Sequence, residues 1–83
     1  MPLRKPDMKR EDVKARYAEG QISATHVIQN PAALGEWIVF FKKSGGRSFF
    51  LVDDQDEVES FASLDRLSEI LRELGIKFAE IHL

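Results

Sequence analysis

Two histidines, His26 and His82, are the side chains of this sequence best suited to bind a transition metal. They stand far apart in the chain, and neither has a second ligand at the His-x-x-x-His spacing of helical zinc sites. The chain has no cysteine, so thiolate ligands and disulfides are excluded. We therefore predict two ordinary strand histidines and no metal site.

The densest group of carboxylates is the acidic segment of residues 53–59. The segment lacks the glycine, the spaced Asp/Asn residues and the final Glu of a calcium-binding loop. We therefore interpret this segment as a solvated turn. Serine, histidine and aspartate also form no nucleophile motif. We predict no cofactor and no catalytic residue, and we expect that the protein is not an enzyme.

A glycine-containing basic link, Ser44-Gly45-Gly46-Arg47, follows Lys42 and Lys43. Glycine exposes backbone N–H groups and arginine binds phosphate, so the link could contact an anion or a nucleic acid. It lacks the phosphate-loop pattern, and no helix is expected after it. The alternative is a hairpin tip kept soluble by charge. The candidate nucleic-acid contacts are Lys42, Lys43, Arg47, Lys9 and Arg10.

Two apolar runs, residues 37–41 and 49–52, flank this link and predict a central β-hairpin. A three-residue loop, Ser44 to Gly46, would pair Phe41 with Phe49 and Trp37 with Asp53, whereas a two-residue Gly45-Gly46 loop would shift the register. Both faces of the hairpin are apolar in either case, although antiparallel sheets usually keep one face polar. Each face therefore needs a cover, and the candidate interface residues are Trp37, Ile38, Phe40, Phe50 and Val52.

The remaining chain supplies the elements around this hairpin. Asp7 could cap a first helix over residues 9–19, which Gly20 would end, and residues 22–29 favour a strand. A second helix is predicted from the N-cap Ser63 to the C-cap Gly75, with leucine and isoleucine at helical spacing. Residues 76–83 favour a last strand at an edge of the sheet. The expected fold is α+β, a two-layer sandwich in the order α-β-β-β-α-β with a mostly antiparallel sheet.

Length and charge set the limits of this interpretation. A chain of 83 residues is long enough for one domain only. We place this domain at residues 8–83, after a flexible tail at residues 1–7. Such a chain buries only roughly 60–65% of its unfolded surface, which favours a homodimer. The net charge is −2, but nine of the acidic side chains lie in residues 53–83. No run approaches the ~20 apolar residues that span a bilayer, and we expect a cytoplasmic protein without a membrane partner.

Three segments carry a resemblance to a known group of proteins. They are Glu19-Gly20-Gln21-Ile22 leading into Ala24-Thr25-His26-Val27, then residues 46–53 (GRSFFLVD), then residues 71–75 (LRELG). The chain resembles small plasmid partition-associated accessory proteins of bacteria, which implies a bacterial setting in plasmid or mobile-element maintenance. We therefore expect a non-enzymatic interaction module, homodimeric and with a protein partner. The alternative is direct nucleic-acid binding through the hairpin tip and the basic first helix, including Arg4, Lys5, Lys14 and Arg16.

Overall fold

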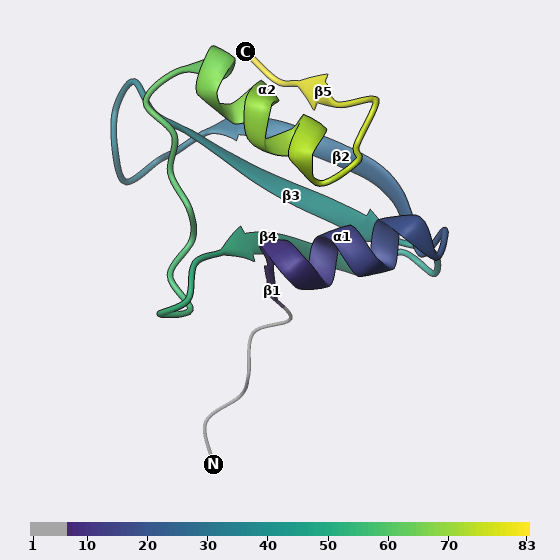
Figure 1. The fold of residues 1–83 in the computed structure, drawn as a ribbon. Helices are drawn as coiled ribbons and strands as arrows, with labels where there is room; N and C mark the ends of the chain where they lie inside the picture. Colours follow the sequence, from purple (N-terminus) through teal and green to yellow (C-terminus); the bar gives the residue numbers. More distant parts are fainter. Residues whose placement is uncertain (1–6) are drawn as a thin grey trace.

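The computed structural model describes residues 7–83, in which the predicted order α-β-β-β-α-β is preceded by one further two-residue strand. The elements are β1 (Met8–Lys9), α1 (Arg10–Ala18), β2 (Ile22–Gln29), β3 (Trp37–Lys43), β4 (Ser48–Val52), α2 (Leu64–Glu73) and β5 (Glu80–Ile81). The strands lie side by side as β1-β4-β3-β2-β5 (Figure 1). An antiparallel meander of β2, β3 and β4 forms the centre, and the two-residue edge strands run parallel to their neighbours.

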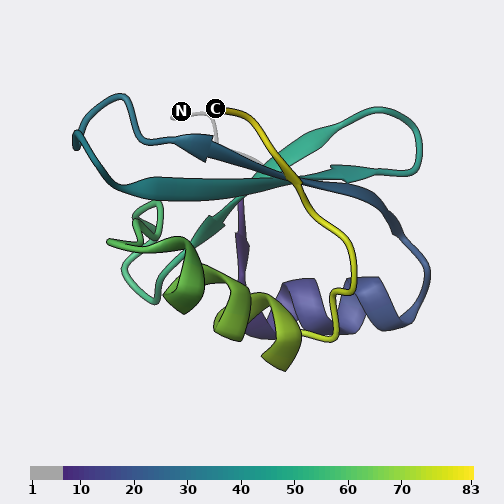
Figure 2. The same cartoon turned by 90° about the horizontal axis from the view of Figure 1, so that it is seen from above.

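The two helices lie on the same side of this sheet, which confirms the predicted two-layer α+β fold (Figure 2). The helices therefore do not straddle the sheet. Alternation along β3 explains which residues each layer covers, because Phe41 points to the helices while its neighbour Phe40 points away. Phe41 is fully buried and Phe40 is half-buried. One face of the sheet is thus the core, and the other face carries no helix.

The central hairpin has the register predicted for a three-residue loop. Phe41 pairs with Phe49 and Phe40 with Phe50, while the Lys43 N–H donates to the Arg47 carbonyl at 2.7 Å. Gly45 and Gly46 have φ angles of +105° and +95°, which only glycine adopts without strain. The expected pair Trp37–Asp53 is wrong, because Trp37 instead exchanges two backbone hydrogen bonds of 2.8 Å with Phe61. The segment after β4 thereby returns to the start of β3.

Helix α2 forms where its local signals predict it. The Ser63 side chain accepts a hydrogen bond from the Arg66 N–H at 3.1 Å and caps the first turn. At the other end, Gly75 has a φ of +86°, and the Ile76 N–H donates to the Leu71 carbonyl at 2.9 Å. This is the Schellman arrangement, and it places Ile76 back over the helix. Ile76 is accordingly buried.

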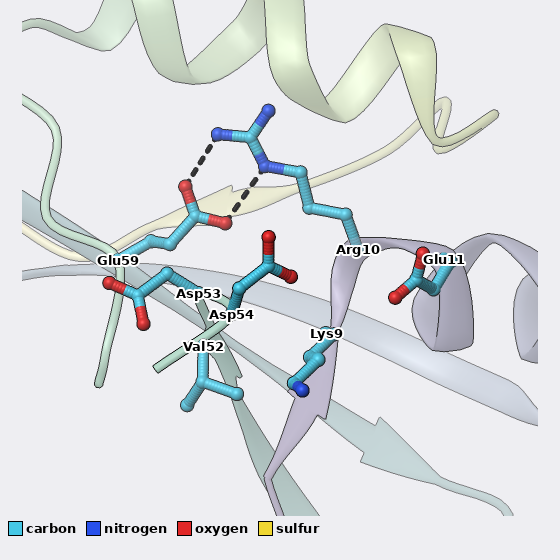
Figure 3. Close-up of a pocket in the computed structure, with 7 residues that line it drawn as sticks. All are labelled: Lys9, Arg10, Glu11, Val52, Asp53, Asp54 and Glu59. Carbon is cyan, nitrogen blue, oxygen red and sulfur yellow. Dashed lines mark hydrogen bonds and ion pairs between the residues drawn. The ribbon is translucent and has the colours of Figure 1, made fainter. Parts of the chain in front are cut away.

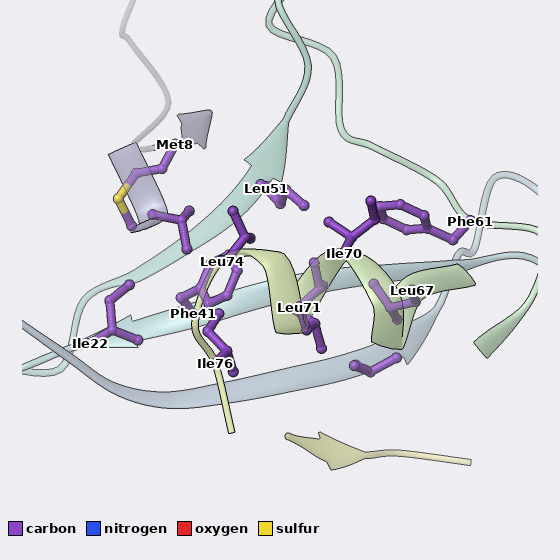
Figure 4. Packing of buried hydrophobic residues seen from close by; sticks show 13 residues of the cluster. Met8, Ile22, Phe41, Leu51, Phe61, Leu67, Ile70, Leu71, Leu74 and Ile76 are labelled. Atoms are coloured by element: carbon purple, nitrogen blue, oxygen red, sulfur yellow. The ribbon is translucent and has the colours of Figure 1, made fainter. Parts of the chain in front are cut away.

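The hydrophobic core lies between the helices and the sheet, and Figure 4 shows most of its side chains. Its members come from both helices, all three strands of the meander and the segments between them. They are Met8, Val13, Ile22, Val27, Val39, Phe41, Leu51, Phe61, Leu67, Ile70, Leu71, Leu74 and Ile76. Helix α1 contributes only Val13 to this set. Helix α2 contributes most of the apolar surface that closes the core.

Two predictions near the chain ends need correction. Asp7 does not cap the first helix, because Met8 and Lys9 form a strand beside β4, and the helix begins at Arg10 without a side-chain cap. The Asp7 carboxylate instead accepts a hydrogen bond from the Phe50 N–H at 3.4 Å. The last strand is at the edge of the sheet, as expected, but it is limited to Glu80–Ile81. Of the expected flexible tail, only Asp7 belongs to the described residues.

Candidate functional site

The face of the sheet that the helices leave free carries a row of rings. Backbone pairing sets His26 of β2 opposite Phe40 of β3, and Phe40 opposite Phe50 of β4. The His26 and Phe40 rings stack with centroids 5.0 Å apart, and the Phe40 and Phe50 rings meet edge to face at 5.8 Å. All three side chains are half-buried. We call the surface around His26, Phe40 and Phe50 the open face.

The other predicted interface residues are placed differently. Ile38 and Val52 alternate with the core residues, which places them on the open face, but they are only 6% and 1% exposed. Figure 3 shows the Val52 side chain pointing away from the helix layer. Trp37 packs against the core cluster instead, so it does not share a face with Phe40 and Phe50. Of the five residues, Phe40 and Phe50 therefore remain the most accessible on the open face.

The two ends of the hairpin carry opposite charges. Lys42, Lys43 and Arg47 lie at the tip, where Lys43 Nζ is 5.4 Å from the centroid of the Phe49 ring. At the other end, β4 runs directly into the acidic turn of residues 53–57, which holds Asp53, Asp54, Asp56 and Glu57. The Asp53 carboxylate accepts the N–H groups of Gln55 and Glu57 at 2.8 and 3.0 Å, which fixes this turn. The hairpin is therefore positive at one end and negative at the other.

The five candidate nucleic-acid contacts do not form one patch. Lys42, Lys43 and Arg47 are at the hairpin tip, whereas Lys9 lies beside Val52 at the opposite end of β4. Arg10 follows Lys9, and its guanidinium is bound to Glu59. Lys14 and Arg16 are exposed on α1, and Arg4 and Lys5 lie outside the described residues. The folded chain thus separates the tip cations from the first basic residues of the helix.

The ion pair of Arg10 with Glu59 lines an open cleft of about 340 Å³ between α1 and the end of β4 (Figure 3). Arg10 Nε and Nη2 donate to the two carboxylate oxygens at 2.8 and 2.5 Å. The hydrogen bond to Glu59 raises the pKa of Arg10 above its ordinary value. The other side chains of the cleft are Lys9, Glu11, Val52, Asp53 and Asp54. The arginine of this cleft is thus already paired with a carboxylate. The ion pair connects the start of α1 to the segment that follows the acidic turn.

A third cluster lies where β5 pairs with β2. Glu80 pairs with His26, and Ile81 pairs with Val27, so that Glu80 and His82 point to the same side of the sheet as His26. The His26 Nδ1 and His82 Nε2 atoms are 3.0 Å apart. This cluster was not predicted, because its ligands come from two segments that are distant in the sequence rather than from one element. The Glu-x-His spacing of Glu80 and His82 on a strand was the available signal.

Comparisons of this chain with protein-family models, with curated proteins and with solved structures find no match. Within residues 7–83, neither helix has the length and apolar character needed to cross a bilayer. The functional interpretation therefore depends on the surfaces themselves. These are the open face, the two charged ends of the hairpin, and the cluster at β5.

Proposed function

We propose that the chain is a non-enzymatic interaction module that works as a homodimer, with the open face of one copy stacked on that of another. The observation that carries this proposal is the pair Phe40 and Phe50, which lies on the face without helices. Aromatic side chains of this kind supply most of the buried area in protein interfaces. Antiparallel sheets that stay monomeric commonly present a polar outer face instead.

The charges of the hairpin favour a second copy of the chain as the occupant of this face. A two-fold axis brings the same patch of each subunit together, so the patch must be complementary to itself. If the two hairpins stack in opposite directions, the basic tip of one copy lies over the acidic turn of the other. Lys42 and Arg47 are exposed at the tip, and Asp54 and Glu57 are exposed in the turn, so all four can take part. Such complementary charges fix the orientation of the two copies more than they raise the affinity.

The size of the open face implies a weak dimer. Strand β3 has seven residues, and at about 3.3 Å per residue it extends roughly 23 Å. Three central strands spaced about 4.8 Å apart give the face a width of only about 15 Å. This footprint of roughly 350 Å² is less than half of the about 800 Å² that a stable interface buries on each partner. We therefore expect association in the micromolar range rather than the nanomolar range.

The experiment is sedimentation equilibrium over a concentration series from low micromolar to millimolar protein. We expect the mass to rise from 9.5 kDa toward twice that value. Phe50→Lys should keep the chain monomeric across the series, because a charge would replace an aromatic side chain in the buried interface. Phe78→Lys is the matched control, since Phe78 is 84% exposed and lies beside α2, where it lines a hollow with Ser68 and Leu71. A mass of 9.5 kDa at every concentration would refute the dimer.

The resemblance to partition-associated accessory proteins supports a role for this module in plasmid or mobile-element maintenance. The test is the loss rate of a low-copy plasmid that carries the gene, with the intact reading frame or with Phe50→Lys. We expect faster loss with the variant, and Phe78→Lys should behave as the unaltered gene does. Equal loss rates for all three plasmids would remove this role and leave the dimer unaffected.

Direct nucleic-acid binding remains the second candidate, and the tip cations Lys42, Lys43 and Arg47 favour it. Amide chemical shifts measured during titration with a mixed-sequence DNA duplex test it at low and then moderate salt. Shifts that cluster at the tip and reverse with salt would support phosphate contact, because such contacts weaken steeply as salt rises. The absence of shifts at low salt would exclude this candidate.

A further inference from the structure

We propose that His26, Glu80 and His82 form a binding site for a divalent transition metal, with zinc as the expected ion. One nitrogen of each imidazole and one oxygen of the carboxylate converge, and the three ligand atoms lie within 4.8 Å of one another. The side chains come from β2, from β5 and from the residue that follows β5, all in a single chain. The site is therefore complete without a second copy of the chain, although His26 also belongs to the open face.

The distances in the cluster fit a metal ion after small adjustments. His26 Nδ1 is 3.0 Å from His82 Nε2 and 3.7 Å from a Glu80 oxygen, and His82 Nε2 is 3.9 Å from the other oxygen. A tetrahedral zinc ion holds neighbouring ligand atoms about 3.3 Å apart, because its bonds to nitrogen and oxygen are about 2.0–2.1 Å long. The observed distances lie on both sides of this value. Rotation of the exposed Glu80 side chain can shorten the two distances to its carboxylate, and the two imidazole nitrogens need to separate by about 0.3 Å from their 3.0 Å contact.

Packing and backbone pairing already hold the two imidazoles in place. The His26 ring stacks on Phe40 with an interplanar angle of 22°, and its side chain is only 15% exposed. The His82 N–H donates to the Val27 carbonyl at 2.8 Å, which fixes the backbone next to the site. A ligand set that is positioned before the metal arrives loses little conformational entropy on binding.

The chemistry of the ligands selects the class of metal. Two imidazoles and one carboxylate suit zinc and related transition metals, whereas calcium and magnesium prefer oxygen ligands. Glu80 and His82 are 69% and 48% exposed, so the remaining coordination position faces solvent at the edge of the sheet. With three protein ligands, the site would keep one position for water or a further ligand.

The binding experiment is a titration of uniformly labelled protein with Zn²⁺, followed through the imidazole nitrogen signals. Protein without a polyhistidine tag is essential, because the sequence then contains only two imidazoles and both belong to the proposed site. We expect both rings to change, with saturation at one equivalent of Zn²⁺ and reversal by a chelator. Mg²⁺ should leave both rings unchanged, although it can bind carboxylates of the acidic turn.

Three variants separate this site from weak binding elsewhere. His82→Ala and Glu80→Gln should each weaken Zn²⁺ binding by about tenfold or more, given that even the outer partners of metal ligands have effects of that size. Glu69→Gln is the matched control, because Glu69 is an exposed carboxylate on α2 that pairs with Arg66. The amide spectrum of each variant shows whether it remains folded.

Several outcomes would overturn the proposal. One is a change of the nitrogen signals of a single imidazole only. Another is a shift of these signals that grows with the Zn²⁺ concentration without saturating. Equal affinity of the unaltered protein and folded His82→Ala would also refute it. Any of these results would leave the 3.0 Å contact as a hydrogen bond between two histidines. None of them bears on the dimer, whose test uses sedimentation without metal.

Discussion

Phe40 and Phe41 are adjacent in β3 but face opposite sides of the sheet, so alanine at each position should have a different effect. Phe41 is fully buried in the core cluster. Removing a buried phenylalanine side chain costs about 3–5 kcal/mol of unfolding free energy, because transfer and cavity terms add. Phe40 is half-buried, and Phe40→Ala removes one edge-to-face contact with Phe50 and one stacking contact with His26. We expect this substitution to lower the unfolding free energy by about 1–2 kcal/mol.

These costs are large relative to the stability of such a domain. At about 0.05–0.15 kcal/mol per residue, 83 residues give a total of roughly 4–12 kcal/mol. Phe41→Ala should therefore lower the Tm by roughly 12 °C or more, since about 4–8 °C correspond to each kcal/mol in a domain of this size. Phe40→Ala should leave most of the stability and instead weaken the dimer.

Urea unfolding at protein concentrations well below the expected micromolar dissociation constant measures the first effect with little contribution from association. Trp37 is the only tryptophan and packs against the core, so its fluorescence reports the transition. Sedimentation equilibrium of the same two variants measures the second effect. If Phe40→Ala costs as much unfolding free energy as Phe41→Ala, the open face is covered within one chain and the proposed interface is wrong.

Three further substitutions test local features of the fold, each by urea unfolding. Gly75→Ala should cost about 1–2 kcal/mol, because an alanine at a φ of +86° is strained although its Cβ would meet no close neighbour; no loss would contradict the observed helix end. Ser63→Ala should cost about 1 kcal/mol through loss of the N-cap, and Ser63→Asp should restore it. Arg10→Gln should cost about 1 kcal/mol, since the guanidinium is partly exposed and solvent screens its bond to Glu59. An effect of Arg10→Gln that persists in Glu59→Gln would place the role of Arg10 elsewhere.

Local signals explain why part of this fold could be predicted from the sequence. Ser63 and Gly75 mark both ends of α2 within a few residues of its apolar stripe. The loop between Lys43 and Arg47 likewise fixes the hairpin register through its own length and glycines. These features depend on neighbours along the chain, which sequence patterns describe well.

The rest depends on contacts between distant segments. Met8 and Lys9 have no strand pattern of their own, and they extend because β4 offers an unpaired edge. Asp7 suited a helix cap equally well in the sequence, but pairing with β4 moved the helix start to Arg10. The cluster of His26 with Glu80 and His82 required the knowledge that β5 lies beside β2. No spacing within one element carries that information.

The short edge strands have a consequence for the order in which the chain folds. The meander forms from sequence neighbours, but Asp7 and Phe50 are 43 residues apart in the chain, and His26 and His82 are 56 apart. Closing such long loops lowers the chain entropy before favourable contacts can form. We therefore expect these edges to assemble after the meander. They should also open first, which amide hydrogen exchange would detect as fast exchange at His82 beside slow exchange in β3. A metal bound at β5 would then stabilise the segment that folds last and opens first.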